Sequence, residues 1–304
     1  MRRPRVVAIV GPTGVGKTDV ACEVARRSGA EIINVDSMQV YRGMDIGTAK
    51  PSAALRAEIP HHLIDVVAPD EPMSAGLYAE LARHAAAEID ARGRPILLCG
   101  GTGLYARAFA GGLVDVGGAD RALRAELRAR PLPELYAELA QRDPQSARAI
   151  APQDRVRIER ALEAQLQSGA PTSQVRASHG FSDRPFDVRL VGLDLERTEL
   201  AARIEVRVDR MLAAGWVDEV RGLRARYAAE LRPLCAIGYR EIGAFLEGGV
   251  DAEAMRRRIA VATRRYAKRQ RTWFRAEPGL QWVDAGRPER AVEAALAELA
   301  GDRA

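Results

Sequence analysis

The sequence predicts an α/β protein with a parallel sheet flanked by helices and a helical insertion. Three observations lead to this prediction. Apolar runs typical of buried strands alternate with helical segments, a glycine-rich loop joins the first run to the first helix, and strand-like runs are missing between about 115 and 185. We therefore expect a core domain over residues 1–115 and 187–304 and an insertion domain over residues 116–186.

The first part of the core domain is a regular succession of strands and helices. Apolar runs at 5–10, 31–35 and 95–99 are predicted to be buried strands, because parallel strands covered on both faces are apolar throughout. Helices are predicted over residues 17–27 and 76–91, where apolar side chains recur every three or four positions.

Polar and glycine residues follow directly after these strands. Gly11, Asp36 and Gly100 each come at or just after a strand's carboxyl end. That end is the edge of a parallel sheet where ligands bind. We therefore expect three separate segments of the chain to meet in one crevice.

The insertion and the C-terminal part are predicted to be mainly helical. Short Ala-, Leu-, Arg- and Glu-rich stretches broken by prolines fill the insertion, and the run at 186–195 returns the chain to the sheet. Helices near 197–214, 216–230 and 251–275 follow. A short strand at 280–284 and a terminal helix complete the prediction.

The composition excludes several classes of protein. Of 304 residues, 47% are hydrophobic and 29% charged, which is typical of a globular chain. No apolar run reaches the roughly 20 residues of a membrane span, and no cleavage site follows the first apolar run. Three scattered cysteines, Cys22, Cys99 and Cys235, argue against a disulfide framework and a zinc site. We expect a cytoplasmic monomer without membrane contact.

Positive charge is concentrated near the C-terminus. The net charge is +5, and residues 251–275 alone carry nine basic and two acidic side chains. This pattern favours a polyanionic partner, although a solvated helix surface would look the same. A helical wheel separates a basic stripe from an apolar one: Arg257, Val261, Arg264, Lys268, Arg271 and Arg275 against Ile259, Ala262, Tyr266 and Trp273.

Lysine is rare in this chain. It occurs only at Lys17, Lys50 and Lys268, and every other basic residue is arginine. Lysine at these positions suggests a need for a compact ammonium group, with chance as the open alternative for so few cases.

The strongest motif is a phosphate loop. It matches G-x-x-x-x-G-K-[ST] without a departure and lies between a predicted strand and a predicted helix. Its amides and the helix dipole bind phosphate oxygens, its lysine neutralises the terminal phosphate, and its threonine binds Mg²⁺. The motif predicts a P-loop NTPase-like fold with a di- or triphosphate ligand. The residues are Gly11, Pro12, Thr13, Gly14, Val15, Gly16, Lys17 and Thr18, with Thr18 as the metal ligand.

Asp36, directly after the second strand, has three interpretations. It could be a base that faces an acceptor substrate, a carboxylate that holds Mg²⁺, or the N-cap of the next turn. We favour the base, since the second strand of small phosphate-loop kinases usually faces the acceptor. The turn Gly100–Gly103, which contains Thr102, suggests a close approach to a ligand, but alone it is a weak indication.

Five segments, in this order, resemble the bacterial-type tRNA dimethylallyltransferase family: GPTGVGKT, VDSMQVYRGMDIGTAKP, CGGTGLY, CAIGYRE and KRQRTWFR. That family transfers a dimethylallyl group from its diphosphate to the exocyclic amine of the adenosine 3′ to the anticodon. The resemblance implies dimethylallyl diphosphate and the tRNA anticodon stem-loop as partners and Mg²⁺ as cofactor.

The resemblance also implies roles for individual residues. The phosphate loop with Lys17 would hold the prenyl diphosphate instead of ATP, and Asp36 would accept the amine proton. Thr102 would support the amine or the diphosphate, and Arg124 would contact tRNA or the leaving diphosphate. The implied tRNA contacts are Asp36, Ser37, Met38 and Gln39; Val156, Arg157, Ile158, Glu159 and Arg160; Cys235, Ala236, Ile237, Gly238, Tyr239 and Arg240; and Lys268, Arg269, Gln270, Arg271, Thr272, Trp273, Phe274 and Arg275.

Two details of this resemblance stay open. The residues near Met38 and Gln39, and the segment 153–163, depart slightly from the family's usual form. Tyr239, Trp273 and Phe274 could stack on splayed bases, but for at least Trp273 we favour packing in the core.

Three other functions share some of these features. A small-molecule kinase would share the fold and the phosphate loop, and an adenylate isopentenyltransferase would prenylate a free nucleotide. An RNA-binding NTPase switch would hydrolyse a nucleotide without any prenyl transfer. The basic segment at 251–275 favours a large polyanion over a free nucleotide.

Overall fold

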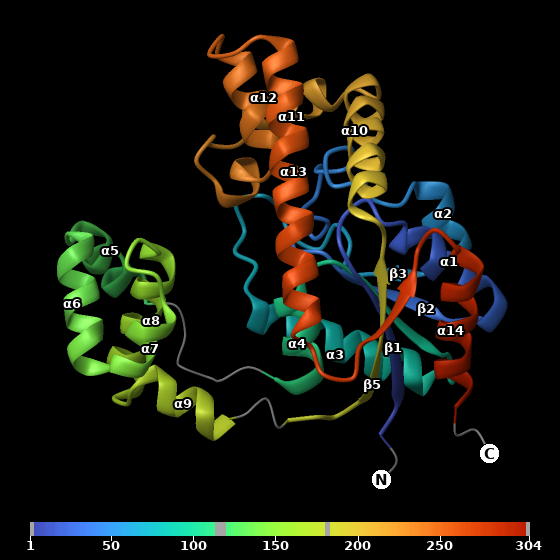
Figure 1. The fold of residues 1–304 in the computed structure, drawn as a ribbon, viewed down its shortest axis with the longest axis horizontal. Helices are drawn as coiled ribbons and strands as arrows, with labels where there is room; N and C mark the ends of the chain where they lie inside the picture. The colour runs from blue at the N-terminus through green and yellow to red at the C-terminus, as the bar shows by residue number, and fades with distance from the viewer. Residues whose placement is uncertain (1–2, 113–119, 180–182, 302–304) are drawn as a thin grey trace. The chain divides into compact units, whose positions relative to one another are not determined.

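The computed structural model describes residues 3–112, 120–179 and 183–301. Contacts divide the chain into two compact units, shown in Figure 1. The core unit comprises Met1–Ala110 and Pro185–Ala304, and the insertion unit comprises Gly111–Arg184. The boundary expected at residues 115 and 116 lies outside the described residues, and the second boundary comes two residues before the expected one.

A single parallel sheet of six strands forms the centre of the core unit. Its strand order is β3-β2-β4-β1-β5-β6. Val10 and Val35 both pair with Gly100, so β1, β2 and β4 end at the same level of the sheet. The strands are β1 (Arg5–Val10), β2 (Glu31–Val35), β3 (His61–His62), β4 (Ile96–Gly100), β5 (Asp187–Asp194) and β6 (Gln281–Asp284).

The predicted strands are confirmed, and one further strand is present. The apolar runs form β1, β2, β4, β5 and β6 to within one residue at most ends. The expected strand at 186–195 is β5, which pairs in parallel with β1. Strand β3 is only two residues long, which is too short to show any hydrophobic period, and the sequence did not predict it.

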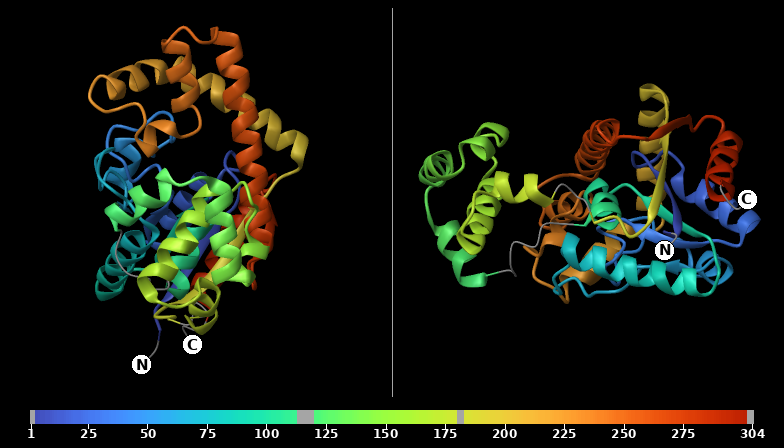
Figure 2. Two further views of the ribbon diagram at one scale, coloured as in Figure 1. Left: turned by 90° about the vertical axis from the view of Figure 1, so that its left-hand side faces the viewer. Right: turned by 90° about the horizontal axis from the view of Figure 1, so that it is seen from below.

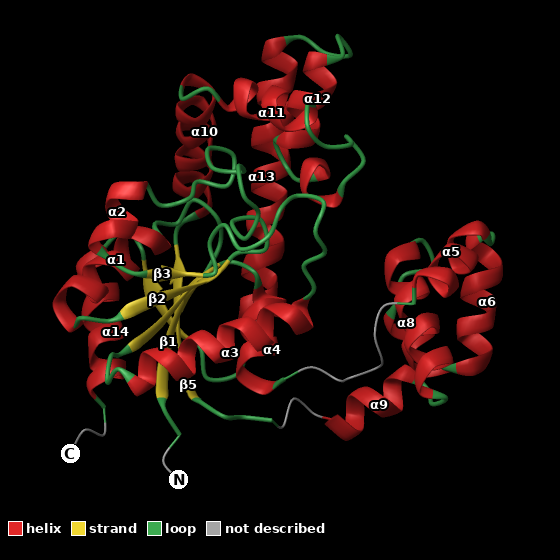
Figure 3. Cartoon of the chain, turned by 180° about the vertical axis from the view of Figure 1, so that it is seen from behind, coloured by secondary structure: helices red, strands yellow, loops and turns green. Residues whose placement is uncertain are grey.

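Helices cover both faces of the sheet (Figure 3). Helix α1 (Lys17–Ser28) and the C-terminal helix α14 (Pro288–Ala300) contact each other and β1. Helix α3 (Ala75–Ala91) packs against β2 and β4. A right-handed crossover from β1 to β2 and the returning crossover to β4 put α1 and α3 on opposite faces. Two short helices complete this part of the core: α2 (Ala53–Glu58) and α4 (Gly103–Gly111).

Four α-helices lie between β5 and β6 in the described part of the core unit. The expected helix at 216–230 ends earlier, as α11, and a 3₁₀ turn (Arg232–Cys235) and helix α12 come after it. The longest helix, α13, packs against α10 and α12 and extends to the sheet (Figure 2). The bounds are α10 (Arg197–Ala213), α11 (Trp216–Arg224), α12 (Tyr239–Leu246) and α13 (Ala252–Arg275).

The insertion unit is helical, as predicted, and has a hydrophobic core of its own. Leu135, Leu139, Ile158 and Leu162 are fully buried there. Asp143 accepts hydrogen bonds from Ser146 and Ser173; burial raises its pKa, but these bonds outweigh burial and lower it to about 2. The helices are α5 (Arg121–Ala129), α6 (Leu132–Arg142), α7 (Pro144–Ala149), α8 (Arg155–Ser168) and α9 (Thr172–His179).

None of the described helices is both long and apolar enough to cross a membrane.

Gly238 offers a stability test of the packing beneath α12. Its φ is +89°, and a Cβ atom there would lie 2.0 Å from the Trp216 ring. Gly248 has a similar φ of +76° and open space around it. We predict that Gly238→Ala lowers the free energy of unfolding by about 2 kcal/mol more than Gly248→Ala. Urea denaturation of both variants measures this, and equal losses would contradict the packing.

Candidate active site

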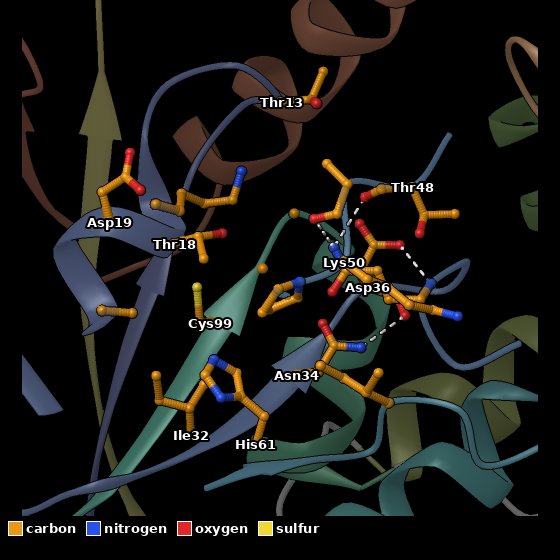
Figure 4. A pocket seen from close by; sticks show the side chains of 18 of the residues that line it. Thr13, Thr18, Asp19, Ile32, Asn34, Asp36, Thr48, Lys50, His61 and Cys99 are labelled. Atoms are coloured by element: carbon orange, nitrogen blue, oxygen red, sulfur yellow. Dashed lines mark hydrogen bonds between the residues drawn. The ribbon is translucent and has the colours of Figure 1, made fainter. Parts of the chain in front are cut away.

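A cavity of about 290 Å³ lies at the carboxyl edge of β1, β2 and β4. The phosphate loop, the segment after β2 and the turn after β4 all line it, as their positions in the sequence predict. Helices α10 and α13 add one polar side chain each. The lining residues with polar side chains include Thr13, Lys17, Thr18, Asn34, Asp36, Gln39, Thr48, Lys50, His61, Arg207 and Gln270 (Figure 4).

Lys17 is an ammonium group without an acidic partner among the described residues. Its Nζ donates to the Pro12 carbonyl oxygen at 2.8 Å. Burial lowers the pKa of Lys17 to about 8; Cys99 and Asp36 act in the opposite direction, and Arg207 adds to the lowering. A buried cation of this kind is stabilised by an anionic ligand, as the phosphate-loop motif predicts.

Arg207 is a further cation of the cavity, and it was not predicted from the sequence. It projects from α10, it lines the cavity, and no described acidic residue forms an ion pair with it. Burial lowers its pKa, and nearby Asp36 partly offsets this. Arginines are common in α10, so no local pattern distinguishes this one.

Asp36 uses one carboxylate oxygen for structure and leaves the other available. Oδ1 accepts hydrogen bonds from the backbone amides of Met38 (2.8 Å) and Gln39 (3.4 Å). No described residue bonds to Oδ2. The capping interpretation and the substrate-facing interpretation of Asp36 are therefore compatible, because each uses a different oxygen.

Thr102 holds the residue that follows Asp36. Its Oγ1 accepts a hydrogen bond from the Ser37 amide at 3.1 Å, and its own amide donates to the Val35 carbonyl at 3.0 Å. The Tyr266 hydroxyl of α13 also interacts with the Thr102 side chain. Thr102 thus ties the turn after β4 to the end of β2.

The wall of the cavity after Asp36 is fixed by internal polar contacts. Lys50, whose side chain is 2% exposed, donates to Tyr41 O (2.6 Å), Asp45 Oδ1 (2.7 Å) and Asp65 Oδ1 (2.5 Å). Glu219 of α11 accepts from the amides of Asp45, Ile46 and Gly47. Lys50 therefore has a structural role that requires a compact ammonium group.

Apolar and neutral polar side chains also line the cavity. The apolar ones include Ile32, Ile64 and Ala21, and His61 and Cys99 belong to the same lining. Burial raises the pKa of Cys99 to about 12, so its thiol stays protonated and is a poor nucleophile. Burial lowers the pKa of His61, whose Nδ1 lies 2.7 Å from the Ile59 carbonyl oxygen.

Residues 37–39 take part mainly in internal contacts beside the cavity. Gln39 lines the cavity, and its Nε2 donates to the carbonyl oxygens of Thr48 (3.0 Å) and Ala49 (3.2 Å). Ser37 and Met38 are half-buried, with their amides bonded to Thr102 and Asp36. A contact between these residues and tRNA stays a prediction.

The segment 268–275 divides between solvent and core, which corrects the expectation that all of it contacts tRNA. Gln270 and Phe274 are 6% and 1% exposed, so Phe274 cannot stack on a base in this conformation. Arg271 is ion-paired with Asp194, and Trp273 is half-buried beneath the Arg107 guanidinium. The exposed members are Lys268, Arg269, Thr272 and Arg275.

The basic stripe of α13 also needs correction. Arg257, Arg264 and Arg271 are paired with Glu253, Glu205 and Asp194. The exposed cations without an acidic partner in the described part of the chain are Arg258, Arg265, Lys268 and Arg269. Most arginines of the predicted stripe are therefore engaged in intramolecular ion pairs. The four exposed cations without acidic partners are the ones available to a polyanion.

The segment 235–240 is divided in the same way. Cys235 and Arg240 are exposed, Ala236 and Ile237 are half-buried, and Gly238 and Tyr239 are buried. The Tyr239 hydroxyl donates to Glu219 Oε1 at 2.7 Å. Stacking of Tyr239 on a base is therefore excluded in this conformation, because its ring belongs to the core.

The predicted residues of the insertion unit lie on α5 and α8. Val156, Arg157 and Arg160 are exposed and Glu159 is half-buried, whereas Ile158 is fully buried in the unit's core and cannot contact tRNA in this conformation. Arg124 Nε donates to Glu163 Oε1 at 2.6 Å. A catalytic role for Arg124 stays a prediction.

The donor set fits Mg²⁺ only in company with a phosphate ligand. Among the described residues, no group of three or more His, Cys, Asp or Glu side chains could hold a metal ion. Thr18 lines the cavity, and no described residue bonds to its hydroxyl or to Asp36 Oδ2. Magnesium typically binds through one or two protein oxygens, substrate phosphates and water, so this sparse set suits a magnesium–diphosphate complex.

The fold and cavity define a class of protein. A parallel sheet whose first strand leads into an intact phosphate loop, with lysine, arginine and aspartate side chains in one cavity, is typical of P-loop proteins that act on a phosphorylated substrate.

Comparison with known proteins identifies the family. The chain belongs to the IPP transferase family, whose model matches residues 39–277, and an isopentenyl transferase model matches residues 4–61. It is 46% identical to a tRNA dimethylallyltransferase of Geobacter sulfurreducens, over 93% of this chain and 92% of that one. It is 48% identical to one from Desulfosudis oleivorans, over 93% and 91%.

Two solved structures resemble the whole chain. A tRNA isopentenylpyrophosphate transferase of Bacillus halodurans is 37% identical, with a TM-score of 0.72 over 98% of this chain and 97% of that one. A eukaryotic dimethylallyltransferase acting on tRNA is 28% identical, with a TM-score of 0.83 over 93% of this chain and 74% of that one.

The lowered pKa of Lys17 predicts a pH dependence of phosphate binding. With a pKa of about 8, Lys17 loses its proton as the pH rises above 8, and a phosphate anion is attracted to the protonated form. We predict that the affinity for dimethylallyl diphosphate, measured by calorimetry from pH 7 to 9.5, falls about tenfold per pH unit above 8. Lys17→Arg keeps its charge over this range and should lack the fall. A fall that persists in Lys17→Arg would mean that another group is responsible.

Proposed function

We propose that this protein transfers the dimethylallyl group of dimethylallyl diphosphate to the exocyclic amine of the adenosine 3′-adjacent to the anticodon of tRNA, with release of diphosphate. The observation that carries the proposal is the cavity. It places a phosphate loop and the free oxygen of Asp36 together in a chain of the IPP transferase family.

The donor is bound through its diphosphate. The phosphate loop and two half-buried cations, Lys17 and Arg207, line the same cavity. The bond between C1 and the bridging oxygen breaks, and the electron pair leaves with the diphosphate. The allylic carbon tolerates developing positive charge, so stabilisation of the leaving anion by Lys17 and Arg207 lowers the barrier. Ile32 and Ile64 offer apolar surface for the five-carbon chain.

The acceptor amine is activated by Asp36. An adenine amine is a poor nucleophile because its lone pair is delocalised into the ring. As nitrogen forms its bond to C1, Asp36 Oδ2 accepts the amine proton, a step of general base catalysis that typically contributes about 10²- to 10⁴-fold. The adenine leaves the anticodon-loop stack to reach this position. The Oδ1 bonds to Met38 and Gln39 orient the carboxylate.

Thr18 is the residue that would hold Mg²⁺ beside the diphosphate. When bound, the ion would add to the neutralisation of the leaving group's charge. Asp36 would act as the base, because its free oxygen is needed for the amine proton.

The free cations of α13 provide a surface for the RNA backbone. Arg258, Arg265, Lys268 and Arg269 are exposed and lack acidic partners in the described part of the chain. They lie on the helix that also reaches the cavity through Gln270. We propose that this surface and the exposed residues of α8 contact tRNA. We also propose that the protein is cytoplasmic and acts as a monomer. A monomer suffices because all residues that line the cavity belong to one core unit.

The test is a transfer assay with radiolabelled dimethylallyl diphosphate, Mg²⁺ and unmodified tRNA, with AMP and ATP in parallel reactions. Label in tRNA is expected. Label in AMP alone would identify an adenylate prenyltransferase, and phosphate release from ATP without label transfer would identify a kinase or an NTPase. Either of these results overturns the proposal.

Asp36→Asn separates the two roles of Asp36. The amide oxygen can still cap the Met38 amide, but the side chain no longer accepts a proton at neutral pH. We predict a kcat at least about 100-fold lower, with an unchanged melting temperature and a tRNA Kd within about threefold. Asp36→Ala should lose the cap as well and melt at a lower temperature. Normal turnover in either variant would exclude Asp36 as the base.

Removal of free cations from α13 should weaken tRNA binding and flatten its salt dependence. We predict that Arg265→Ala with Lys268→Ala lowers the slope of log Kd against log salt by about 1.5, as expected for two lost phosphate contacts. Arg287→Ala with Arg290→Ala, which removes two exposed charges beside and on α14, is the matched control. Filter binding over a salt series measures both. Equal slopes in the two double variants would assign these side chains to the solvated surface.

A further inference from the structure

Gln270 lies on the buried face of α13, within the segment that the sequence assigns to tRNA. Its side chain lines the cavity and is 6% exposed, while the adjacent Lys268 and Arg269 point to solvent. Gln270 therefore faces the opposite direction from the cations proposed for the RNA backbone. A buried amide needs partners for both its oxygen and its nitrogen, and those partners show what it holds.

The amide of Gln270 joins two loops of the active site. Oε1 accepts a hydrogen bond from the Thr13 amide of the phosphate loop at 2.8 Å. Nε2 donates to the Gly101 carbonyl oxygen, in the turn after β4, at 2.9 Å. A Cβ atom on Gly101 would lie 2.1 Å from Nε2, so a glycine is needed for this approach. The absence of a side chain at Gly101 therefore makes room for Gln270 of the protein itself.

The polar contacts of Gln270 continue towards Asp36, the residue proposed to face the acceptor amine. The Tyr266 hydroxyl, one turn earlier on α13, interacts with the side chains of Gln270 and Thr102. Thr102 in turn accepts from the Ser37 amide, next to Asp36. Burial raises the pKa of Tyr266, so its hydroxyl stays protonated, although the contacts with Thr102 and Gln270 act in the opposite direction. One chain of polar contacts therefore runs from the phosphate loop to the Asp36 turn through α13.

We propose that Gln270 is a positioning residue that fixes the phosphate loop relative to Asp36, and that it does not contact tRNA. The inference rests on the proposed function for the identity of the two substrates. Gln270 acts through the loops that it joins: the distance between the leaving diphosphate and the incoming amine depends on them, and a small displacement there lowers the rate steeply.

The test compares Gln270→Met with Lys268→Ala. Methionine keeps the size of the side chain but can neither accept from Thr13 nor donate to Gly101. For Gln270→Met we expect pyrophosphate affinity and kcat each to fall about 10-fold or more, with a tRNA Kd within twofold of the unsubstituted protein. For Lys268→Ala we expect the opposite pattern: a raised tRNA Kd with unchanged pyrophosphate affinity. Pyrophosphate titration calorimetry, tRNA filter binding and steady-state transfer supply the three readouts.

Tyr266→Phe covers the case in which Gln270→Met fails to fold, as judged by circular dichroism. It keeps the buried ring and removes only the hydroxyl, so we expect a kcat several-fold lower with unchanged tRNA Kd. A raised tRNA Kd with normal pyrophosphate affinity in Gln270→Met would make Gln270 a tRNA contact and overturn the proposal. Normal values throughout, in Gln270→Met or, if it does not fold, in Tyr266→Phe, would overturn it too. Absence of transfer by the unsubstituted protein would refute the proposed function, while the pyrophosphate comparison would still decide the role of Gln270.

Discussion

Lys50 and Glu219 hold the chain that forms one wall of the cavity, between Asp36 and α2. This segment has almost no regular secondary structure, so its backbone groups need partners from elsewhere. Lys50 satisfies the Tyr41 carbonyl and two carboxylates, and Glu219 satisfies three successive amides. These two side chains therefore fix much of the backbone that forms this wall of the cavity.

Helix α13 presents different side chains on its two faces. Its buried face supplies Gln270 to the phosphate loop and Phe274 to the core, while its exposed face carries cations without acidic partners in the described part of the chain. Under the proposed function, one helix would contact the tRNA backbone with one face and position the phosphate loop with the other.

Features that depend on neighbouring residues in the chain, such as strands and loops, could be predicted from the sequence. The direction in which a helical side chain points in the folded protein could not. The strands, the phosphate loop and the position of Asp36 follow from continuous runs and spacing, and the structure confirms where they lie. Consecutive residues of α13, in contrast, point about 100° apart, so one segment sends Lys268 to solvent and Gln270 to the core. Arg207 escaped prediction because nothing in its own helix distinguishes it; only the fold brings it to the cavity.

The insertion leaves the core after α4 and returns at β5, and its hydrophobic cluster is closed within itself. Substitutions in separate clusters have nearly additive effects on stability. Natural variation can therefore reshape the surface of α5–α9 without altering the alignment of β1 with β4 and β5. In evolutionary terms, the insertion unit is a module. Its length and charge can change independently of the cavity residues at the carboxyl edge of the sheet.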